Sequence, residues 1–386
     1  MKRILTSEYV GCGHPDKLAD LISDAILDAY LEHDNKSKVA VETMIKDNIV
    51  VVGGEITSNI NIDIDSVIRR VFDDVKYPSS HKLKSSDIKI INLIGTQSPE
   101  INNAVFTNDE INAGDQGLMF GFASKDTNNR LPLGVYLSKT IANYLNKEGK
   151  YGPDLKTQVV VAEDGDTKTI ENILVSTQFD YGYELDDVRE EIEYLIRNNK
   201  NQFIDEDVFD LINSNTNIII NPSGTWRIGG PISDCGITGR KIVVDQYGSY
   251  CPVGGGAFSG KDSSKVDRSG AYLARYIAKN IIECDSSIHS CQVQIGYMIG
   301  KSEPCSFSVI PYDKYNNIYG CERYLKKLNE FCFNIFPTKP HEIIKKFGLD
   351  KPIFYKTTFN GHFGNNINEW EKINSNIIQE YNKFFK

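Results

Sequence analysis

The apolar positions of this chain follow helical and strand spacings whose order recurs along the sequence. Over residues 16–33, leucine, isoleucine and alanine return at i, i+3 and i+4, which predicts an amphipathic helix. Shorter apolar runs then predict two strands joined by a turn, a second helix and a further strand. The same order is expected twice more. The predicted elements are helices at 16–33, 63–75, 132–146, 185–198, 269–283 and 319–334, and strands at 39–45, 49–56, 88–94, 157–162, 170–177, 218–221, 291–298 and 305–311.

Three occurrences of one order of helices and strands predict three similar units of mixed α/β structure. A chain of 386 residues is long enough for two or three domain-sized units. The polar loop 97–112 and the turn-rich stretch 221–236 are the expected boundaries. The loop could close over a site as a mobile lid, or it could be a plain surface connection, and both interpretations stay open.

Aspartates recur every four residues along the first predicted helix, at Asp16, Asp20, Asp24 and Asp28. Like charges at that spacing destabilise a helix by about 0.2–0.5 kcal/mol per pair unless they are solvated or paired. We therefore expect Asp20, Asp24 and Asp28 to lie on a solvated face. Asp16 differs from them because it follows Pro15, in the first turn of the helix.

Charge and composition narrow the range of partners. A formal charge of −9 argues against a sequence-independent nucleic-acid binder, whose affinity would rest on basic patches. No apolar run approaches the roughly 20 residues that a membrane-spanning helix needs, so we expect neither nucleic acid nor a membrane as partner. The 8 cysteines are scattered without a Cys-x-x-Cys pair, which predicts reduced thiols and a cytoplasmic protein.

The densest chemical signal is the glycine-rich stretch 254–268, GGGAFSGKDSSKVDR. Its clustered glycines let the backbone approach a ligand closely, and Lys261 and Lys265 stand beside them. A helical pattern follows, so phosphate could bind at the helix start, with Asp267 placed for a cation. The alternative is a flexible loop ahead of an ordinary capped helix. A Walker loop is excluded, because the glycine spacing and the ending differ.

Two further clusters carry residues suited to anion binding. The sequence Gly-His-Pro-Asp-Lys at 13–17 places His14 just outside a helix start, where anions bind, although a structural hydrogen-bonding role is the alternative. The glycine-punctuated stretch 229–241 ends on Arg240 and Lys241, ahead of a predicted strand Ile242–Asp245. This basic pair could clamp a phosphate tail or could be surface charge.

Other classes of enzyme leave no trace in the sequence. There is no Gly-x-Ser-x-Gly elbow of a nucleophilic triad, and neither cysteine nor histidine recurs at zinc spacing. The residues that remain as candidates in these clusters are basic side chains that suit phosphate, carboxylates that suit a hard cation, and His14. Mg²⁺ typically takes one or two carboxylates together with substrate phosphates. The residues therefore indicate a nucleotide or polyphosphate enzyme that uses Mg²⁺, and they lead no further.

Taken together, the motifs resemble those of the S-adenosylmethionine synthetases, the methionine adenosyltransferases. The resemblance implies an α/β fold of three similar domains related by a pseudo-threefold. It implies transfer of the adenosyl group of ATP to the sulfur of L-methionine, and cleavage of the tripolyphosphate to pyrophosphate and phosphate. It also implies a homodimer or homotetramer with active sites shared between subunits. The matching motifs are Gly-His-Pro-Asp-Lys at 13–17, Gly-Gly-Glu at 53–55, Ala-Gly-Asp-Gln-Gly-Leu-Met-Phe-Gly at 113–121, and the stretches 229–241 and 254–268.

The resemblance further implies a role for each matching residue, with two Mg²⁺ and one K⁺ per site. Asp154 and Lys156 fall on the family's Asp-x-Lys nucleotide motif, although the residues alone predict solvent-facing side chains there. The implied sets are, for catalysis, His14, Lys156, Arg240, Lys241, Lys261 and Lys265; for ATP, His14, Asp154, Lys156, Thr225, Trp226, Asp234, Arg240, Lys241, Ala257 and Lys261; for methionine, Glu55, Gln97, Asp115, Asp234 and Lys265; and for metal ions, Asp16 and Asp267 with Mg²⁺ and Glu42 with K⁺.

The chain departs from the family pattern at Cys12, usually acidic, at Asn112, usually glycine, and at Val253, commonly histidine. Trp226 stands where phenylalanine is common, and the loop 97–112 is shorter than usual. A catalytically silent homologue and an unrelated Mg²⁺-dependent kinase are the competing interpretations. The expected domains are an N-terminal domain at 1–100, a mobile active-site loop at 101–112, a central domain at 113–228, a C-terminal domain at 229–372 and a tail at 373–386.

Overall fold

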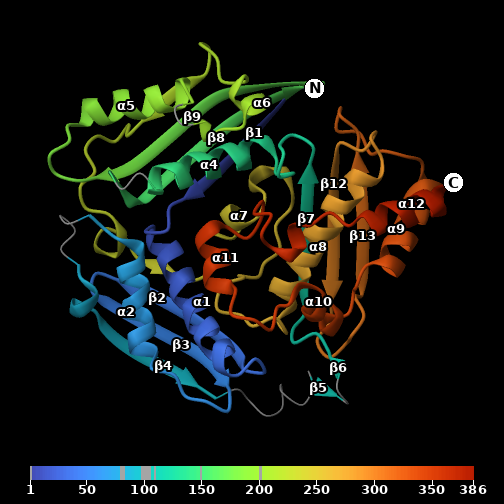
Figure 1. Cartoon of the computed structure of the whole chain (residues 1–386), viewed down its shortest axis with the longest axis horizontal. Coiled ribbons are helices and arrows are strands. Elements are labelled where there is room, and N and C mark those ends of the chain that lie inside the picture. The colour runs from blue at the N-terminus through green and yellow to red at the C-terminus, as the bar shows by residue number, and fades with distance from the viewer. Residues whose placement is uncertain (1, 79–82, 97–105, 108–109, 148–149, 200–201) are drawn as a thin grey trace.

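The computed structural model describes residues 2–78, 83–96, 106–107, 110–147, 150–199 and 202–386. Within these ranges the strands form three larger sheets and one two-stranded sheet. Figure 1 shows the larger sheets arranged around a centre that holds the helices α1, α4 and α8. These helices are α1 (Pro15–His33), α4 (Leu133–Lys147) and α8 (Val266–Cys284), and the small sheet pairs β5 (Phe106–Thr107) with β6 (Glu110–Ile111).

The N-terminal sheet has the strand order β11-β2-β3-β4, and the central sheet has the order β1-β8-β9-β10. In each, an antiparallel hairpin is followed by a helix and then by a strand parallel to the second strand of the hairpin. The elements of the first are β2 (Lys38–Lys46), β3 (Ile49–Thr57), α2 (Ile64–Val75), β4 (Lys89–Gly95) and β11 (Gly236–Ile237), and those of the second are β1 (Arg3–Val10), β8 (Tyr151–Asp164), β9 (Thr167–Phe179), α5 (Leu185–Arg197), α6 (Glu206–Phe209) and β10 (Asn217–Ile220).

The C-terminal sheet has the order β13-β12-β7, and within the described ranges it has no parallel fourth strand. Helices follow its hairpin instead, and they pack beside α8 or against β13. The elements are β7 (Gly117–Ser124), β12 (Ser290–Tyr297), β13 (Ser306–Tyr312), α9 (Glu322–Ile335), α10 (Pro340–Phe347) and α12 (Ser375–Phe385), with α7 (Ile242–Asp245) and α11 (Phe354–Asn360) at the centre of the molecule.

The remaining strand of each sheet comes from another part of the chain. β1 precedes α1 but pairs with β8, β7 precedes α4 but pairs with β12, and β11 precedes α8 but pairs with β2. This cyclic exchange joins the three units and agrees with the expected pseudo-threefold arrangement of similar α/β units. It also means that none of the three larger sheets is built from one of the predicted ranges alone, and the domain boundaries stay a prediction.

The helices and strands expected from periodicity are confirmed, most with bounds shifted by a few residues. The predicted strand Ile242–Asp245 is wrong, because these residues form the helical turn α7. Tertiary contacts override the preference of Ile242 and its neighbouring valines for extended structure, since Lys17 Nζ bonds the Asp245 carboxylate at 2.5 Å. β7 was not predicted, because a strand buried along most of its length shows no alternation of polar residues.

The aspartates of α1 do not lie on a solvated face, so that expectation is wrong. Asp20 and Asp24 are fully buried, and Asp28 is half-buried. Cations and backbone amides replace water: Asp20 receives Lys17 Nζ at 3.0 Å, and Asp24 receives the guanidinium of Arg268 at 2.7 Å. Repulsion along the helix is thereby compensated inside the fold.

Every aspartate of this row also accepts a backbone N–H from a segment more than 200 residues further along the chain. The four-residue spacing keeps the carboxylates on one side of α1, so the helix acts as a row of acceptors for neighbouring segments. A buried N–H needs such a partner, and each carboxylate supplies one. The amides received by Asp16, Asp20, Asp24 and Asp28 are, in order, those of Ile237, Gly239, Gly260, and Phe354 together with Tyr355.

Replacing Asp28 by asparagine is expected to flatten the pH dependence of stability between about pH 5 and pH 8. Burial raises the pKa of Asp28 to about 7 from an ordinary value of 3.8. The folded chain then holds a proton that the unfolded chain releases, so the contribution of Asp28 to stability falls as the pH rises through this interval. We expect the change in unfolding free energy between the two pH values to shrink by about 2 kcal/mol. Urea unfolding at both pH values measures it, and an unchanged difference contradicts the prediction.

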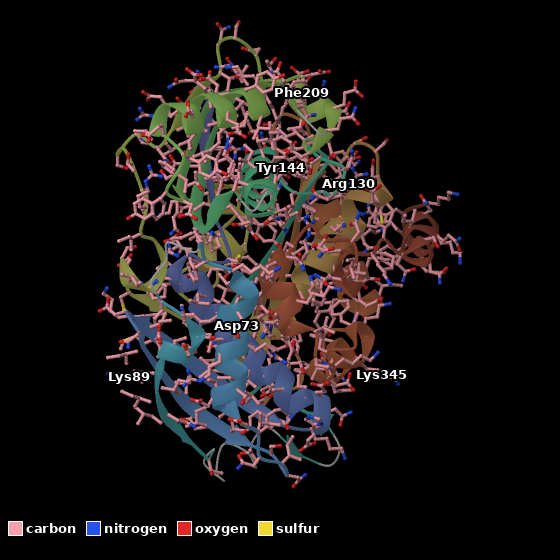
Figure 2. All side chains as sticks on the ribbon, turned by 60° about the vertical axis from the view of Figure 1, so that its left-hand side comes forward. Asp73, Lys89, Arg130, Tyr144, Phe209 and Lys345 are labelled. Carbon is pink, nitrogen blue, oxygen red and sulfur yellow. The ribbon has the colours of Figure 1, made fainter. Side chains whose placement is uncertain are left out.

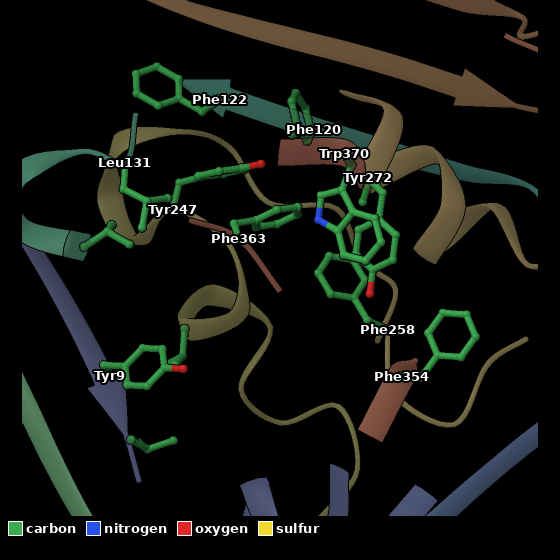
Figure 3. Close-up of a cluster of buried hydrophobic side chains, with 14 of the residues drawn as sticks. Tyr9, Phe120, Phe122, Leu131, Tyr247, Phe258, Tyr272, Phe354, Phe363 and Trp370 are labelled. Atoms are coloured by element: carbon green, nitrogen blue, oxygen red, sulfur yellow. The ribbon is translucent and has the colours of Figure 1, made fainter. Parts of the chain in front are cut away.

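An aromatic core fills the centre and anchors the glycine-rich stretch (Figure 3). The rings of Tyr272 and Trp370 stack at 4.0 Å between centroids, and Tyr247 stacks on Phe363 at 5.0 Å. Phe258, within the glycine-rich stretch, packs 5.9 Å from Tyr272 of α8. Aromatic packing therefore holds the stretch from the core side, and of its glycines Gly255 has open space where a side chain would stand.

The central and C-terminal parts are also joined by polar contacts at their boundary. Arg130, labelled in Figure 2, donates from Nε to Glu283 of α8 at 2.5 Å. Deeper in, Nε and Nη2 of Arg275 donate to the two carboxylate oxygens of Glu371, both at 2.9 Å, and neither side chain is exposed. Within the central part, Tyr144 of α4, labelled in Figure 2, stacks on Phe203 at 4.1 Å between ring centroids. The contacts of Glu283 and Arg275 fix α8, which carries Asp267, relative to the rest of the chain.

Candidate active site

The start of α1 presents a neutral histidine. His14 caps the helix, and its Nδ1 accepts the backbone N–H of Asp16 at 3.2 Å. Burial and the nearby charge of Lys241 lower the pKa of His14 to about 3, so the ring is uncharged near neutral pH. Because Nδ1 is the acceptor, the proton of the neutral ring lies on Nε2, which can donate to an anionic ligand.

Asp16 connects this helix start to the stretch 229–241. Its carboxylate receives Lys241 Nζ at 2.6 Å and the N–H of Ile237 at 3.0 Å. Burial alone would raise the pKa of Asp16, yet these two hydrogen bonds lower it overall. Lys241 precedes α7 rather than a strand, and its side chain is only 15% exposed. Arg240 is exposed beside it.

Asp154 belongs to the same region, and its predicted solvent-facing position is wrong. It is buried on β8 and accepts the N–H of Gly230 at 2.6 Å. Burial raises the pKa of Asp154 to about 7, and within the described chain its Oδ1 has no hydrogen-bond partner. Lys156 is 45% exposed and lies 4.0 Å from Glu8. The sequence alone gave no signal for the burial of Asp154, because its contact comes from a distant segment.

We call these residues and their neighbours the His14 group. Trp226 is half-buried, and its indole N–H donates to the carbonyl of Ile228 at 2.9 Å, which fixes the plane of the ring. Thr225 and Asp234 are exposed. The members are His14, Asp16, Asp154, Lys156, Thr225, Trp226, Asp234, Arg240 and Lys241.

A second assembly surrounds an open cavity of about 450 Å³ between the N-terminal sheet and the glycine-rich stretch. Lys261 Nζ pairs with the Asp267 carboxylate at 2.6 Å, and both side chains line this cavity. A Cβ at Gly256 would lie 2.1 Å from the carboxylate carbon of Asp267, and one at Gly117 would lie 2.9 Å from its Oδ1. The glycines therefore leave room for that carboxylate.

A further cavity of about 400 Å³ shares Glu42, Ala257 and Lys261 with the first and adds Glu55 to its lining. Lys265 lines neither cavity; its Nζ pairs with the buried Asp262 at 2.5 Å. Asp115 is exposed just before Gln116, which lines the larger cavity. We call this assembly the Lys261 group, with the members Glu42, Glu55, Asp115, Ala257, Lys261, Lys265 and Asp267.

In the described part of one chain, the two groups are separate in their side-chain hydrogen bonds and ion pairs. Within the described ranges, no hydrogen bond or ion pair joins a side chain of one group to a side chain of the other. Backbone links them instead, because Thr238 and Gly239 line the larger cavity while the adjacent Ile237 binds Asp16. Sequence reasoning missed these two lining residues, although the glycine spacing of the stretch 229–241 was a signal. Gln97 and most of the loop 97–112 lie outside the described residues.

Glu42 and Glu55 lie on the outer face of the N-terminal sheet, together with apolar side chains. The other face packs on α1 and α2, so alternate residues such as Val41 and Val52 are fully buried. The outer face exposes Met44, Ile91 and, at 66%, Leu93. The strand register aligns Glu42 with Gly53 and Leu93, and Met44 with Val51 and Ile91.

Two departures from the family pattern have a structural outcome. Cys12 is buried, and burial raises the pKa of its thiol to about 12, so the thiolate is not available near neutral pH. Asn112 is buried, and it is not one of the described residues with left-handed backbone. The conformational freedom of a glycine is therefore not required at that position. Val253 is half-buried.

The carboxylates fit Mg²⁺ held jointly with a polyphosphate. Among the described residues no three potential metal ligands come together, so there is no preformed site made of protein alone. Asp16 and Asp267 each offer one carboxylate beside a lysine. Mg²⁺ accepts such a set, since it prefers octahedral oxygen ligands and completes them with phosphate and water.

Three family models match almost the whole chain. They are the N-terminal, central and C-terminal domains of S-adenosylmethionine synthetase, over residues 2–99, 110–226 and 228–372. The chain belongs to the S-adenosylmethionine synthetase family. Its similarity to S-adenosylmethionine synthases of known sequence is equally extensive: 41% identity with that of Helicobacter hepaticus, over 96% of this chain and 95% of the other, and 38% with that of Mycoplasma capricolum, over 99% and 98%.

A solved S-adenosylmethionine synthetase also shares the fold. The structure of an unusual S-adenosylmethionine synthetase from Campylobacter jejuni superposes with a TM-score of 0.86 at 33% identity, covering 99% of this chain and all of the other. The three-unit α/β fold and the family expected from the motifs are confirmed. The activity is that of a methionine adenosyltransferase, which forms S-adenosylmethionine from ATP and L-methionine. None of the described helices is long and apolar enough to cross a membrane.

Proposed function

We propose that each active site of this S-adenosylmethionine synthetase is formed by the His14 group of one chain and the Lys261 group of a second copy. The observation that carries this is the position of Glu42 and Glu55, which share an open apolar sheet face with Leu93. Monomeric proteins rarely expose such faces, and a twofold axis buries the same face on both copies. Docking of two copies there brings the Lys261 group of each against the other chain. A homodimer is thus the smallest complete enzyme, and a homotetramer would add a further contact.

ATP would be held across both groups. The half-buried ring of Trp226 offers a face for stacking of adenine, with Thr225 and Ala257 beside the nucleotide. Oδ1 of Asp154, which lacks a partner within the described chain, is available to a hydroxyl or amino donor of the nucleoside. The cationic side chains of Lys156, Arg240, Lys241 and Lys261 would bind the triphosphate.

Methionine would lie beside the exposed carboxylates. Glu55 lines the smaller cavity, and Asp115 and Asp234 are exposed at the edges of their groups. Carboxylates attract the amino group of methionine and favour the sulfonium that forms on its sulfur. We assign Lys265 to the methionine carboxylate, after release from Asp262, and Gln97 to the same substrate.

The chemistry explains why the site needs no general base. The thioether sulfur of methionine attacks C5′ of ATP and carries no proton, so a new S–C bond forms as the C5′–O bond breaks. The protein must align the sulfur, the carbon and the leaving oxygen, and it must stabilise charge on the departing tripolyphosphate. Nε2–H of the neutral His14 and the ammonium groups of Lys241 and Lys261 can donate to that chain. The same groups would hold tripolyphosphate during its hydrolysis to pyrophosphate and phosphate.

Two Mg²⁺ per site would be held by Asp16 and Asp267, each together with phosphate oxygens, and one K⁺ by Glu42. Bound divalent cations neutralise charge on the polyphosphate and so make it a better leaving group. Lys241 and Lys261 now pair with these carboxylates, and we expect both lysines to turn to the phosphates when the metal ions are present. All cysteines are free thiols, which supports a reducing compartment and a cytoplasmic location.

Incubation of the purified protein with ATP, L-methionine, Mg²⁺ and K⁺ tests the proposed reaction. We expect S-adenosylmethionine, phosphate and pyrophosphate in equal amounts. A protein that binds ATP but forms no S-adenosylmethionine would be a catalytically silent homologue, and a phosphorylated acceptor would indicate a kinase.

A further inference from the structure

A fully buried ion pair connects α1 to the start of α8. Nη1 and Nη2 of Arg268 donate to Oδ1 and Oδ2 of Asp24, both at 2.7 Å, and neither side chain has any exposed surface. A two-point contact of this kind fixes the plane of the guanidinium as well as its distance. The pair therefore sets the position of one segment relative to the other.

The same two side chains hold the backbone on both sides of the peptide that enters Lys261. The N–H of Gly260 donates to Asp24 Oδ1 at 2.8 Å, and Nη1 of Arg268 donates to the carbonyl of Lys261 at 3.0 Å. Gly260 has a φ of +78°, so the chain turns sharply there. Asp24 thus binds the N–H of Gly260, and Arg268 binds the carbonyl of the next residue, Lys261.

Arg268 also determines where Asp267 lies, because the two residues are adjacent in the first turn of α8. Lys261 Nζ and the Asp267 carboxylate meet at 2.6 Å and line the larger cavity. One buried pair therefore fixes the backbone of both residues. Its other contacts lead into the core: Thr358 Oγ1 donates to Asp24 at 2.5 Å, and Nε of Arg268 donates to Tyr272 at 3.1 Å.

We propose that Asp24 and Arg268 are positioning residues for polyphosphate binding, which hold Lys261 and Asp267 at the cavity without touching substrate. This inference rests on the proposed role of the Lys261 group. We assign no such role to Asp28, because this residue lies one turn further along α1 and binds amides of α11. A loss of the pair should displace Lys261 more than it changes the remainder of the fold.

The test compares affinity for inorganic tripolyphosphate, measured by calorimetry on the full-length protein, with the midpoint of thermal unfolding. Arg268→Lys keeps a cation for Asp24 but cannot bind both the carboxylate and the Lys261 carbonyl in the same geometry. Asp24→Asn removes the charge and one acceptor. Two controls leave the turn at Lys261 intact: Asp28→Asn alters the same helix, and Tyr272→Phe removes the hydroxyl that accepts from Nε of Arg268. Lys261→Ala serves as the reference.

We expect Arg268→Lys and Asp24→Asn to weaken tripolyphosphate binding at least about tenfold, and the controls to weaken it less than about twofold, even where they lower the unfolding midpoint. Should Asp24→Asn fail to fold, Arg268→Lys decides alone. The inference is overturned if Arg268→Lys binds tripolyphosphate with wild-type affinity. It is also overturned if the control variants lose affinity for tripolyphosphate in proportion to the decrease in their unfolding midpoints. If Lys261→Ala itself binds tripolyphosphate normally, the proposed function fails. If Lys261→Ala is weak and Arg268→Lys is not, only the positioning role fails.

Discussion

Replacing Lys261 by alanine is expected to lower kcat by about 100- to 1,000-fold. The reason is that a fixed donor aimed at developing charge in a shielded site typically contributes this much to a rate. Lys261 lines both cavities of its group, and its side chain is only 24% exposed. Water that enters after the substitution therefore cannot fully replace the charge of its ammonium group. Steady-state formation of S-adenosylmethionine at saturating ATP and methionine measures the loss.

Lys314→Ala is the matched control for this substitution. Lys314 also pairs with one aspartate, Asp166, at 3.1 Å, but both side chains are more than half exposed. Such surface pairs contribute little to stability, and this one lies outside both groups. We expect its kcat to equal that of the wild type. A rate for Lys261→Ala within about twofold of the control would remove Lys261 from the mechanism.

Leu93→Asp is expected to separate the two copies and to abolish most of the activity. An isologous interface contains each residue twice, so the dimer of this variant would contain two added carboxylates. Both would have to be desolvated among apolar side chains when the dimer forms, which is unfavourable. We expect the dissociation constant of the dimer to rise at least about 100-fold, which corresponds to about 2.7 kcal/mol. Sedimentation across a range of concentrations measures it, and activity should follow the fraction of dimer.

Ile367→Asp provides the comparison. Ile367 is 69% exposed, much as Leu93 is, but it lies between α11 and α12 rather than on the N-terminal sheet. Its replacement should change neither association nor rate. If Leu93→Asp behaves like Ile367→Asp, the open sheet face is not the contact between copies.

Local periodicity was sufficient to predict most elements of the fold. The helix at 16–33 and the hairpin that follows it carry strong helical and strand patterns, and both form as expected. Such patterns report which side of an element is apolar, and they say nothing of which distant strand pairs with it. The exchange of β1, β7 and β11 among the sheets was therefore not predictable from spacing.

The aspartate row shows the same limit for charged residues. A four-residue repeat of Asp20, Asp24 and Asp28 on one helix is typical of a solvated face. Lys17 of the same helix pairs with Asp20, but Arg268 and the backbone amides that reverse the conclusion come from distant segments. Burial of charge depends on where the compensating charge lies in space. A single sequence does not contain that information for segments more than 200 residues apart.

For the site, composition and spacing led only to a Mg²⁺-dependent nucleotide enzyme, and the reaction came from the family resemblance. The structure then adds what neither gave, namely the division of the residues into two groups. His14, Asp16 and Lys241 are gathered at the start of α1, whereas Lys261 and Asp267 line a separate cavity. Ile237, which binds Asp16, and Gly239, which lines the cavity, lie where the backbone passes from one group to the other.

Complementation between two inactive variants tests most directly that each active site is shared. His14→Asn and Lys261→Ala chains with different affinity tags are co-expressed, and the mixed dimer is purified through both tags. If the groups belong to different chains of each site, one site of the mixed dimer carries both substitutions and the other carries none. We predict about half of the wild-type kcat per dimer. Activity no higher than that of the separate variants would contradict the shared site.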